Sequence, residues 1–302
     1  DSARRSESSP EYYSKMVALY PLFQPFIENA LGVVVHSDSA RDVLAKQFPE
    51  GPKVIKLDLP YAQSRAAVER DFHAQQLQFV FCGHVGSNRR LAEFFKAWGQ
   101  LEHPDRIRLD IFGNYGNTSQ LERLAQRFGV SRWLDFRGYV EDEALEQSLR
   151  EAHFALNLRW PTMGEASASQ LRYWSAALPT LVTDVGWYGE LPDDTVCKVS
   201  RDNEVESLRE RLQDIVDSPG RYAAVGVAGW QYLKSQHSPQ TYARKLIHFA
   251  EHCTNARLGY QMVDKALVNT VASMCEDESV LRLFREPVDT ARTMFDQHTS
   301  VR

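Results

Sequence analysis

From residue 78 onward, short apolar segments alternate with amphipathic ones, and this alternation constrains the fold more than any other feature of the chain. The apolar segments predict strands at residues 78–83, 108–113, 133–138, 154–159, 179–186 and 195–199. Segments with helical periodicity lie between most of them, at residues 89–100, 118–128, 141–151, 167–177 and 203–216. Strands that alternate with helices build βαβ units. The sequence therefore predicts an α/β fold with a Rossmann-like, mostly parallel sheet flanked by helices.

Shorter segments flank this alternation on both sides. Upstream, the pattern predicts a helix over 11–30 with a bend near Pro21 or Pro25, strands at 31–35 and 53–57, and a helix that begins near Ser39 with Ser37 or Asp38 as its cap. Downstream, we expect helix from Pro219 to residue 253, then two helices over 255–302 with a break near Pro287. These patterns divide the chain into residues 1–60, 61–254 and 255–302.

Composition narrows the class of protein. Hydrophobic residues make up 43% of the chain, which suffices for a large core, and the formal net charge of −5 comes from mixed charges without a basic field, so we expect no nucleic-acid partner. No apolar run approaches the ~20 residues of a membrane span, and the polar N-terminus carries no signal-peptide core. The four cysteines form no CxxC pair, which favours reduced core cysteines and a cytoplasmic location: Cys82, Cys197, Cys253 and Cys275.

Some catalytic signatures are missing from the sequence. It contains no HExxH motif, no P-loop lysine, no Gly-x-Ser-x-Gly elbow and no GxGxxG fingerprint. We therefore expect no bound metal and no cofactor. Because ligands of such sheets bind beyond the carboxyl ends of the strands, the candidate site is built from the loops that follow them.

The loop after the strand at 78–83 is one candidate anion site. Gly83 lets the backbone approach a ligand, and Arg89 or Arg90 opens the next helix, where backbone N–H groups also favour an anion. A guanidinium beside such groups suits a diphosphate. The alternative is a capped turn with two solvated arginines.

A second candidate is the turn after the strand at 154–159. Residues 164–167 form a helix start whose free N–H groups, with Ser167 and Ser169, can hold a phosphate, while Glu165 can accept hydrogen bonds from sugar hydroxyls. Alternatively, Glu165 is a favourable charge at a helix start and Ser167 is an ordinary N-cap.

Two further loops are weaker candidates. Trp187 and Glu190, in the loop at 184–192, can contact a sugar ring or ribose, or belong to a packed loop. The loop at 113–117, with Asn114, can approach a base or phosphate.

Several ordered segments resemble one known family. NLRWPTMGEASASQLRYWSAALPTLVTDVGWYGELPDD resembles the donor-site region of family 4 glycosyltransferases, and FCGHVGSNRRLAEFFKAW resembles the first strand, basic loop and helix of their C-terminal domain. The intervening LDIFGNYGN and LDFRGYVEDEAL match in order, and the resemblance spans about residues 31–253. It implies the GT-B fold, in which two Rossmann-like domains face each other across a cleft and the C-terminal one binds a nucleotide sugar.

The resemblance assigns roles to individual residues. Arg89 matches the basic residue that neutralises the donor diphosphate, whereas His84 stands where many members have arginine. Glu165 matches the first glutamate of a Glu-x7-Glu motif that contacts the donor sugar, but the second position is Tyr173, and Glu190 is a possible substitute. The expected catalytic residues are Arg89 and Glu165; the expected donor-binding residues are Gly83, His84, Arg90, Asn114, Tyr139, Arg159, Gly164, Ser167, Ser169, Gly186, Trp187 and Glu190.

The activity that the resemblance implies is metal-free glycosyl transfer with retention, from a nucleotide sugar to a glycan, polysaccharide or lipid-linked acceptor, with possible peripheral membrane contact. Residues 1–60 then correspond to a remnant of the acceptor-side domain, residues 61–254 to the donor domain and residues 255–302 to a helical tail. Most of the acceptor domain is expected to be supplied by a longer chain. The main alternative is a degenerate, non-catalytic module; a sugar-nucleotide epimerase ranks below both.

Overall fold

The computed structural model describes residues 24–62, 66–113, 118–162 and 164–274 of the 302-residue chain. The chain forms two compact units, Asp1–Leu246 and Ile247–Arg302. The helix α12 (Pro239–Met274) runs through this division, so the expected boundary at residue 254 also falls within one continuous helix. Of the helix expected over 11–30, α3 (Gln24–Glu28) is described. The break expected near Pro287 lies outside the described residues.

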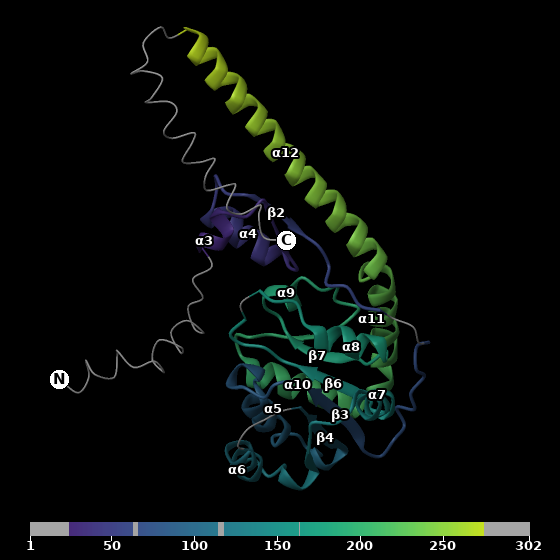
Figure 1. Cartoon of the computed structure of the whole chain (residues 1–302). Helices are drawn as coiled ribbons and strands as arrows, with labels where there is room; N and C mark the ends of the chain where they lie inside the picture. The colour runs from purple at the N-terminus through teal and green to yellow at the C-terminus, as the bar shows by residue number, and fades with distance from the viewer. Residues whose placement is uncertain (1–23, 63–65, 114–117, 163, 275–302) are drawn as a thin grey trace, which may run out of the picture. The chain divides into compact units, whose positions relative to one another are not determined.

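A six-stranded, entirely parallel sheet forms the centre of the first unit (Figure 1). Its strand order is β5-β4-β3-β6-β7-β8, which confirms the predicted α/β class. The strands are β3 (Leu77–Cys82), β4 (Ile107–Phe112), β5 (Leu134–Gly138), β6 (Phe154–Asn157), β7 (Thr180–Thr183) and β8 (Cys197–Val199). Because β3 is followed in space by β6, the order of strands reverses between them, and the carboxyl ends of this pair open a crevice for a ligand.

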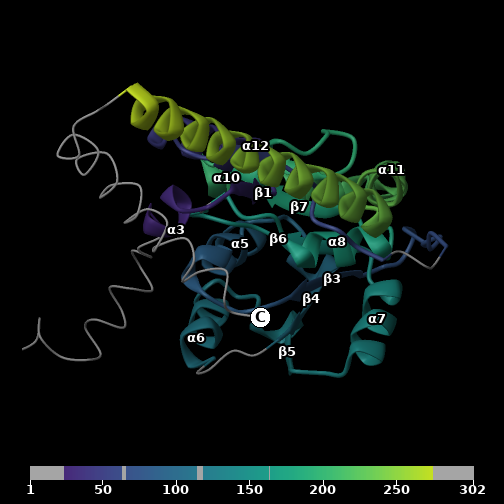
Figure 2. The same cartoon turned by 45° about the horizontal axis from the view of Figure 1, so that its top comes forward.

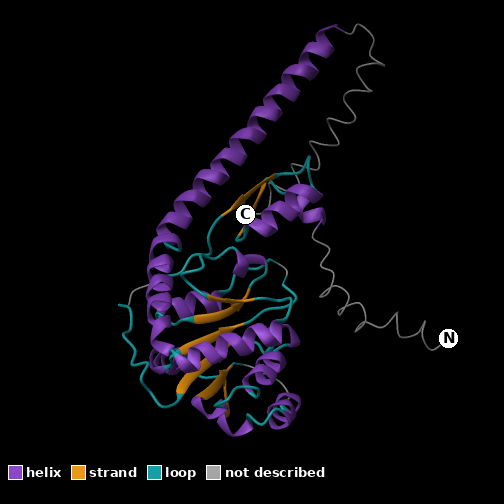
Figure 3. Ribbon diagram, turned by 180° about the vertical axis from the view of Figure 1, so that it is seen from behind, coloured by secondary structure: helices purple, strands orange, loops and turns teal. Residues whose placement is uncertain are grey.

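The side chains of each strand alternate between two helical layers. On β3, Phe79 and Phe81 belong to the larger core cluster, together with residues of α5 (Leu91–Trp98) and α10 (Glu204–Asp217). Val80 and Cys82 point to the other face, where they pack with residues of α7 (Asp142–Glu151) and α8 (Ala168–Ser175). The strands, orange in Figure 3, are thus covered on both faces, and Figure 2 shows α5 and α7 on opposite sides of them.

Further helices of this unit are α6 (Ser119–Arg127), α9 (Gly186–Gly189) and α11 (Ala223–Gln236). The predicted strand at 179–186 is too long, because β7 ends at Thr183 and the chain then turns into α9. The helix predicted from residue 89 begins at Leu91 instead. Ser87–Arg89 form a 3-10 turn, and Arg90, with a φ of 56°, breaks the helical path before α5.

The N-terminal described segment forms a small sheet of its own. The two strands and the helix between them form as the sequence predicts: β1 (Gly32–Val35), α4 (Asp38–Gln47) and β2 (Lys53–Lys56). β1 and β2 pair in parallel. Ser37 is the N-cap of α4, and its hydroxyl accepts a hydrogen bond from the backbone N–H of Ala40. Of the two predicted caps, Ser37 is therefore the one used.

Arg70 joins the ends of two helices that cover the sheet. Its guanidinium donates to the carbonyl oxygens of Leu149 and Ala152, where α7 ends, and to those of Ala176 and Ala177, just after α8. These carbonyls have no partner within their helices, and the partial negative charge of a helix C-terminus favours a cation there. Burial lowers the pKa of Arg70 to about 10, which leaves the side chain charged at neutral pH.

We predict that Arg70→Ala lowers the free energy of unfolding by about 3 kcal/mol, because four buried carbonyls lose a charged donor. Arg70→Lys should recover only part of this, since an ammonium lacks the planar fork of five donors. Urea unfolding followed by circular dichroism measures both values. Arg123→Ala, an exposed position on α6, is the control, and an equal effect of the two alanine variants would contradict the prediction.

Candidate functional site

The carboxyl end of β3 is held against the first turns of α8. Beyond the last pairing of β3 with β6, at Val80 and Ala155, the backbone of Cys82 is bound by side chains of α8. The Tyr173 hydroxyl accepts from the Cys82 N–H at 2.7 Å, and the Ser169 hydroxyl donates to the Cys82 carbonyl at 3.1 Å. The start of α8 is thereby fixed at the point where the strand order reverses.

The start of α8 is also fixed from β6. The Ser167 hydroxyl caps the helix by accepting from the Gln170 N–H, which is the alternative role that the sequence left open for it, and Asn157 at the end of β6 donates to the same hydroxyl at 3.1 Å. The first N–H groups of a helix have no intrahelical acceptor, and they carry partial positive charge. Residues 168–169 therefore present a rigid, electropositive turn at the switch point.

Arg89 lies beside this turn. Its Nε donates to the carbonyl of His84, and its guanidinium lies 5.9 Å from the centre of the Phe81 ring. A Cβ added to Gly83, whose φ is 136°, would lie 3.5 Å from Arg89 Nη2 and 3.6 Å from Ser169 Oγ. Arg89, Gly83 and Ser169 therefore meet at the end of β3, as the sequence predicts.

The Arg89 guanidinium is incompletely satisfied. Its Nη1 is buried and has no hydrogen-bond partner among the described residues. Burial lowers the pKa of Arg89, and the nearby positive charge of Arg159 lowers it further. A buried N–H donor without an acceptor costs about 1–3 kcal/mol. This arrangement favours an anion that would accept from Nη1 and offset the repulsion between the two arginines.

Glu165 is held by residues of the same turn. The Thr162 hydroxyl donates to its Oε2 at 3.0 Å, and Arg159 Nη1 lies 3.2 Å from its Oε1. Arg159 is itself fixed because its backbone N–H donates to the Thr183 hydroxyl. The Glu165 side chain remains 38% exposed, so its carboxylate has a fixed direction and still faces solvent.

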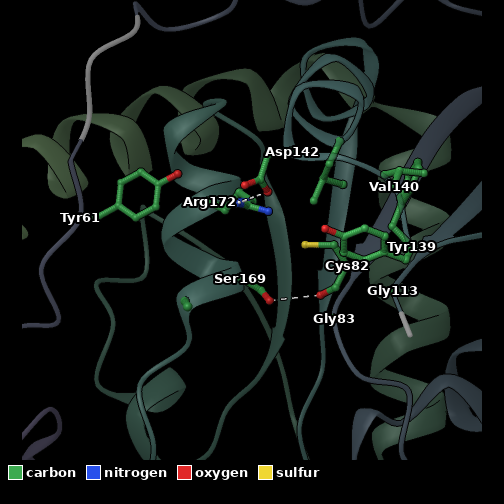
Figure 4. A pocket seen from close by; sticks show the side chains of 12 residues that line it. Tyr61, Cys82, Gly83, Gly113, Tyr139, Val140, Asp142, Ser169 and Arg172 are labelled. Atoms are coloured by element: carbon green, nitrogen blue, oxygen red, sulfur yellow. Dashed lines mark hydrogen bonds and ion pairs between the residues drawn. The ribbon is translucent and has the colours of Figure 1, made fainter. Parts of the chain in front are cut away.

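A pocket of about 390 Å³ lies between the ends of β3 and β4 and the starts of α7 and α8 (Figure 4). Phe112, Val140 and Leu145 give it apolar walls, while Asp142 and Arg172 form an ion pair of 2.9 Å within it. Its volume falls within the range of small-molecule sites. Gly83 and Ser169 line the pocket, so it adjoins the Arg89 guanidinium.

Three polar residues that line this pocket are not among the site residues that the sequence predicts: Tyr61, Asp142 and Arg172. A signal for Arg172 exists in the sequence, since it follows Ser169 by three residues and so shares a face of the helix. Tyr139, at the mouth of the pocket, is one of the predicted donor-binding residues, and it is 74% exposed.

Tyr173 occupies the position where the resemblance expects a second carboxylate. Its side chain is fully buried, and burial raises the pKa of its hydroxyl well above the usual range. The neutral phenol binds the Cys82 backbone and makes no contact with solvent. The chain therefore uses this position to hold the sheet and α8 together.

Other predicted site residues are engaged in protein contacts. Glu190 accepts from the N–H groups of Asp38 and Ser39 at the start of α4, each at 2.7 Å. Trp187 is 2% exposed in a cluster with Trp174. These contacts do not bring Glu190 or Trp187 to Arg89. Their predicted contacts with a donor nucleotide sugar therefore stay predictions. His84 is exposed, and Asn114 lies outside the described residues.

Arg90 binds two carboxylates of the protein. Its Nη2 lies 2.6 Å from Glu204 Oε2 and 2.9 Å from Glu93 Oε1. The Glu204 side chain is only 6% exposed, so this ion pair joins the starts of α5 and α10 inside the protein. Arg90 thus fixes the loop that carries Arg89, and its predicted donor contact stays untested.

The described residues contain no group of three or more His, Cys, Asp or Glu side chains placed to hold a metal ion. Within the same part of the chain, no helix combines the length and apolar character that crossing a membrane requires.

Comparisons with known proteins identify the type of fold. No family model and no curated protein matches the chain, whereas solved glycosyltransferases do. WaaG, a glycosyltransferase involved in lipopolysaccharide biosynthesis, is 16% identical with a TM-score of 0.64, over 80% of this chain and 68% of WaaG. Sucrose-phosphate synthase from Thermosynechococcus elongatus is 14% identical with a TM-score of 0.66, over 82% of this chain and 64% of the synthase.

Anabaena HepE in complex with UDP-glucose is 11% identical with a TM-score of 0.66, over 81% of this chain and 70% of HepE. At such identities the likeness establishes the fold, which is that of GT-B glycosyltransferases. The chain spans less than two thirds of some of the solved structures that it resembles. It covers 64% of the synthase and 45% of TarM, another of these structures.

We predict that Arg90→Ala lowers the free energy of unfolding by about 3 kcal/mol, because it leaves the buried Glu204 carboxylate without a cation. Adding Glu204→Gln should restore part of this loss by removing the uncompensated charge. Urea unfolding of the single and double variants provides the measurement. A double variant no more stable than Arg90→Ala would mean that the charge of Glu204 is not the cause.

Proposed function

We propose that this chain is the donor-binding part of a family 4 glycosyltransferase, which transfers a sugar from a nucleoside diphosphate sugar with retention of anomeric configuration. The observation that carries the proposal is the Arg89 guanidinium. It lies beside the first turn of α8, and its Nη1 is buried and has no partner among the described residues. A donor diphosphate would supply the missing acceptor.

The diphosphate position follows from the charges around the switch point. Arg89 and Arg159 contribute two cations, and the start of α8 adds N–H groups with partial positive charge. When the bond between the sugar and the diphosphate breaks, negative charge grows on the leaving oxygen. Donors fixed before the reaction stabilise that charge without reorganising, which is the main source of catalysis in such a site. The arginines would therefore do the work that a metal ion does elsewhere.

The nucleoside is proposed to occupy the 390 Å³ pocket, which adjoins Arg89 through Gly83 and Ser169. Its apolar walls suit the faces of a base, and the Arg172–Asp142 pair offers donors and acceptors to base or ribose. The solved structures that resemble the chain include HepE with UDP and with UDP-glucose, which supports a nucleotide sugar as the ligand class.

Glu165 is proposed to bind the transferred sugar. Its carboxylate is fixed by Thr162 and Arg159 and is still partly exposed, so it can accept hydrogen bonds from sugar hydroxyls. The acceptor is proposed to be a glycan, polysaccharide or lipid-linked sugar. We place the reaction in the cytoplasm, which the free thiols of Cys82, Cys197 and Cys253 support.

A second candidate is a nucleotide-binding module without transferase activity. Tyr173 favours it, since a buried phenol stands where the family motif has a carboxylate. Both candidates bind nucleotide, and only the first one cleaves the bond between sugar and diphosphate.

We predict that titration with UDP, GDP and dTDP in a calorimeter detects binding of at least one. Arg89→Ala should weaken that binding by about 1.5–3 kcal/mol, the range for a hydrogen bond to a charged group. This corresponds to a dissociation constant about 10- to 150-fold higher. Arg123→Ala, an exposed arginine on α6, is the matched control and should bind as the wild type does.

Two results would count against this site. If none of the three nucleotides binds to protein shown to be folded by circular dichroism, the donor-site proposal fails. If Arg89→Ala binds the nucleotide as tightly as the wild type, Arg89 does not contact the diphosphate.

We predict that Glu165→Ala binds the nucleoside diphosphate as the wild type does but loses at least tenfold in the rate of donor cleavage, about 1.4 kcal/mol in the barrier. Release of nucleoside diphosphate from the nucleotide sugar measures the rate, and proton NMR of the released sugar reports its anomeric configuration. Equal rates in both proteins would remove Glu165 from the chemistry. Binding without any cleavage would favour the non-catalytic module.

A further inference from the structure

We infer that Ser37, which precedes α4, is a positioning residue for Glu165, and that the N-terminal β1–α4–β2 segment thereby supports recognition of the donor sugar. This inference rests on the proposed function, in which Glu165 binds the sugar. It concerns a residue far from the donor loops in sequence, 127 positions before Gly164.

Ser37 makes two hydrogen bonds in a fully buried position. Its hydroxyl donates to the Gly164 carbonyl at 2.6 Å and accepts from the Ala40 N–H at 3.1 Å. Its side chain is 0% exposed, so water cannot replace either bond. One hydroxyl therefore caps α4 and binds the residue next to Glu165.

Gly164 is shaped for this contact. Its φ of 81° lies in the left-handed region that glycine tolerates. A Cβ added there would lie 3.4 Å from Ala40 Cβ and 3.5 Å from Ser37 Oγ, so the backbone at Gly164 packs directly on the first turn of α4. The peptide that follows leads into Glu165, whose direction depends on it.

The same turn is connected to the Glu165 carboxylate through Thr162. The Thr162 hydroxyl accepts from the Gly164 N–H at 3.1 Å and donates to Glu165 Oε2 at 3.0 Å. Ser37, Gly164, Thr162 and Glu165 thus form one continuous chain of contacts. Displacing Gly164 would change the position of the carboxylate even if the Arg159 contact remained.

A second contact keeps α4 in place on this side of the sheet. The Glu190 carboxylate accepts from the N–H groups of Asp38 and Ser39, and Lys56 of β2 lies 3.6 Å from it. A carboxylate at a helix N-terminus is favourable because it meets free N–H groups and the positive end of the helix dipole. The start of α4 is therefore anchored independently of Ser37, so loss of the Ser37 hydroxyl should shift the Gly164 turn more than the helix.

The experiment compares Ser37→Ala and the isosteric Ser37→Cys with the wild type. The ligand is whichever of UDP, GDP and dTDP binds to the wild type, together with its nucleotide sugar, which is UDP-glucose, GDP-mannose or dTDP-glucose. The dissociation constants of the diphosphate and of the nucleotide sugar are measured for each protein. We expect the diphosphate constants to stay within about twofold, and the nucleotide sugar to bind about tenfold more weakly, the scale of one lost hydrogen bond.

A double-mutant cycle with Glu165→Ala makes the test specific. If Ser37 acts through Glu165, then Ser37→Ala has no further effect on nucleotide-sugar binding once Glu165 is alanine. Ser37→Thr keeps the hydroxyl but adds a methyl group in a buried position, and it should bind the nucleotide sugar more tightly than Ser37→Ala does. Asp42→Ala, on the solvent side of α4, is the control for general changes in that helix and should also be neutral.

The outcomes separate this inference from the proposed function. Absence of diphosphate binding in the wild type overturns the proposed function. Normal diphosphate binding with an unchanged nucleotide-sugar constant in Ser37→Ala and Ser37→Cys overturns the role of Ser37 alone. Additive effects in the cycle would also overturn it, since they would mean that Ser37 and Glu165 act independently.

Discussion

The hydrogen bonds between α8 and the backbone of Cys82 are the contact on which the rest of the site depends. The sheet reverses its strand order between β3 and β6, and their pairing extends only to Val80 and Ala155. Beyond that pair, the Cys82 N–H and carbonyl face an unpaired edge. A buried backbone group without a partner costs free energy, so the gap has to be closed from outside the sheet. Tyr173 and Ser169 of α8 close it.

This contact explains why the candidate anion site lies where it does. With Cys82 bound by α8, a Cβ added to the next residue, Gly83, would be in van der Waals contact with both Ser169 and Arg89. The start of α8 and the Arg89 side chain therefore both lie close to Gly83. The N–H dipoles and the guanidinium have the same sign of charge, so a negative group that joined them would make the arrangement more favourable. We regard this concentration of positive charge as the physical basis of the proposed donor binding.

The sequence predicts much of this fold because the fold depends on local patterns. The alternation of apolar and amphipathic segments gives the α/β class, and Ser37 and Ser167 cap helices where their residue types indicate. The limits of the prediction have physical causes as well. Arg90 adopts a left-handed backbone conformation that an arginine rarely takes, and this delays α5 by two residues. Residues 186–189 form a short helix that no periodicity could reveal in four positions.

The site is less predictable than the fold, because residue type alone does not tell which partner a side chain takes. Arg89 and Arg90 are adjacent and chemically identical, yet Arg90 finds the buried Glu204, 114 positions later, while Arg89 keeps a donor without a partner. Glu165 and Glu190 differ in the same way. Both follow strands at the same edge of the sheet, but only Glu165 retains exposure beside the arginines.

The partner of Glu190 could not be predicted, because the start of α4 lies 151 positions away in the sequence. That pairing also changes how the N-terminal segment should be regarded. α4 meets Glu190 on one loop and Gly164 on another, and both loops follow strands of the central sheet. A change in the position of α4 is therefore transmitted to both loops at once. The proposed donor site therefore depends on more than the strands and helices of the central sheet, since the loop that carries Glu165 is held by the helix that joins β1 and β2.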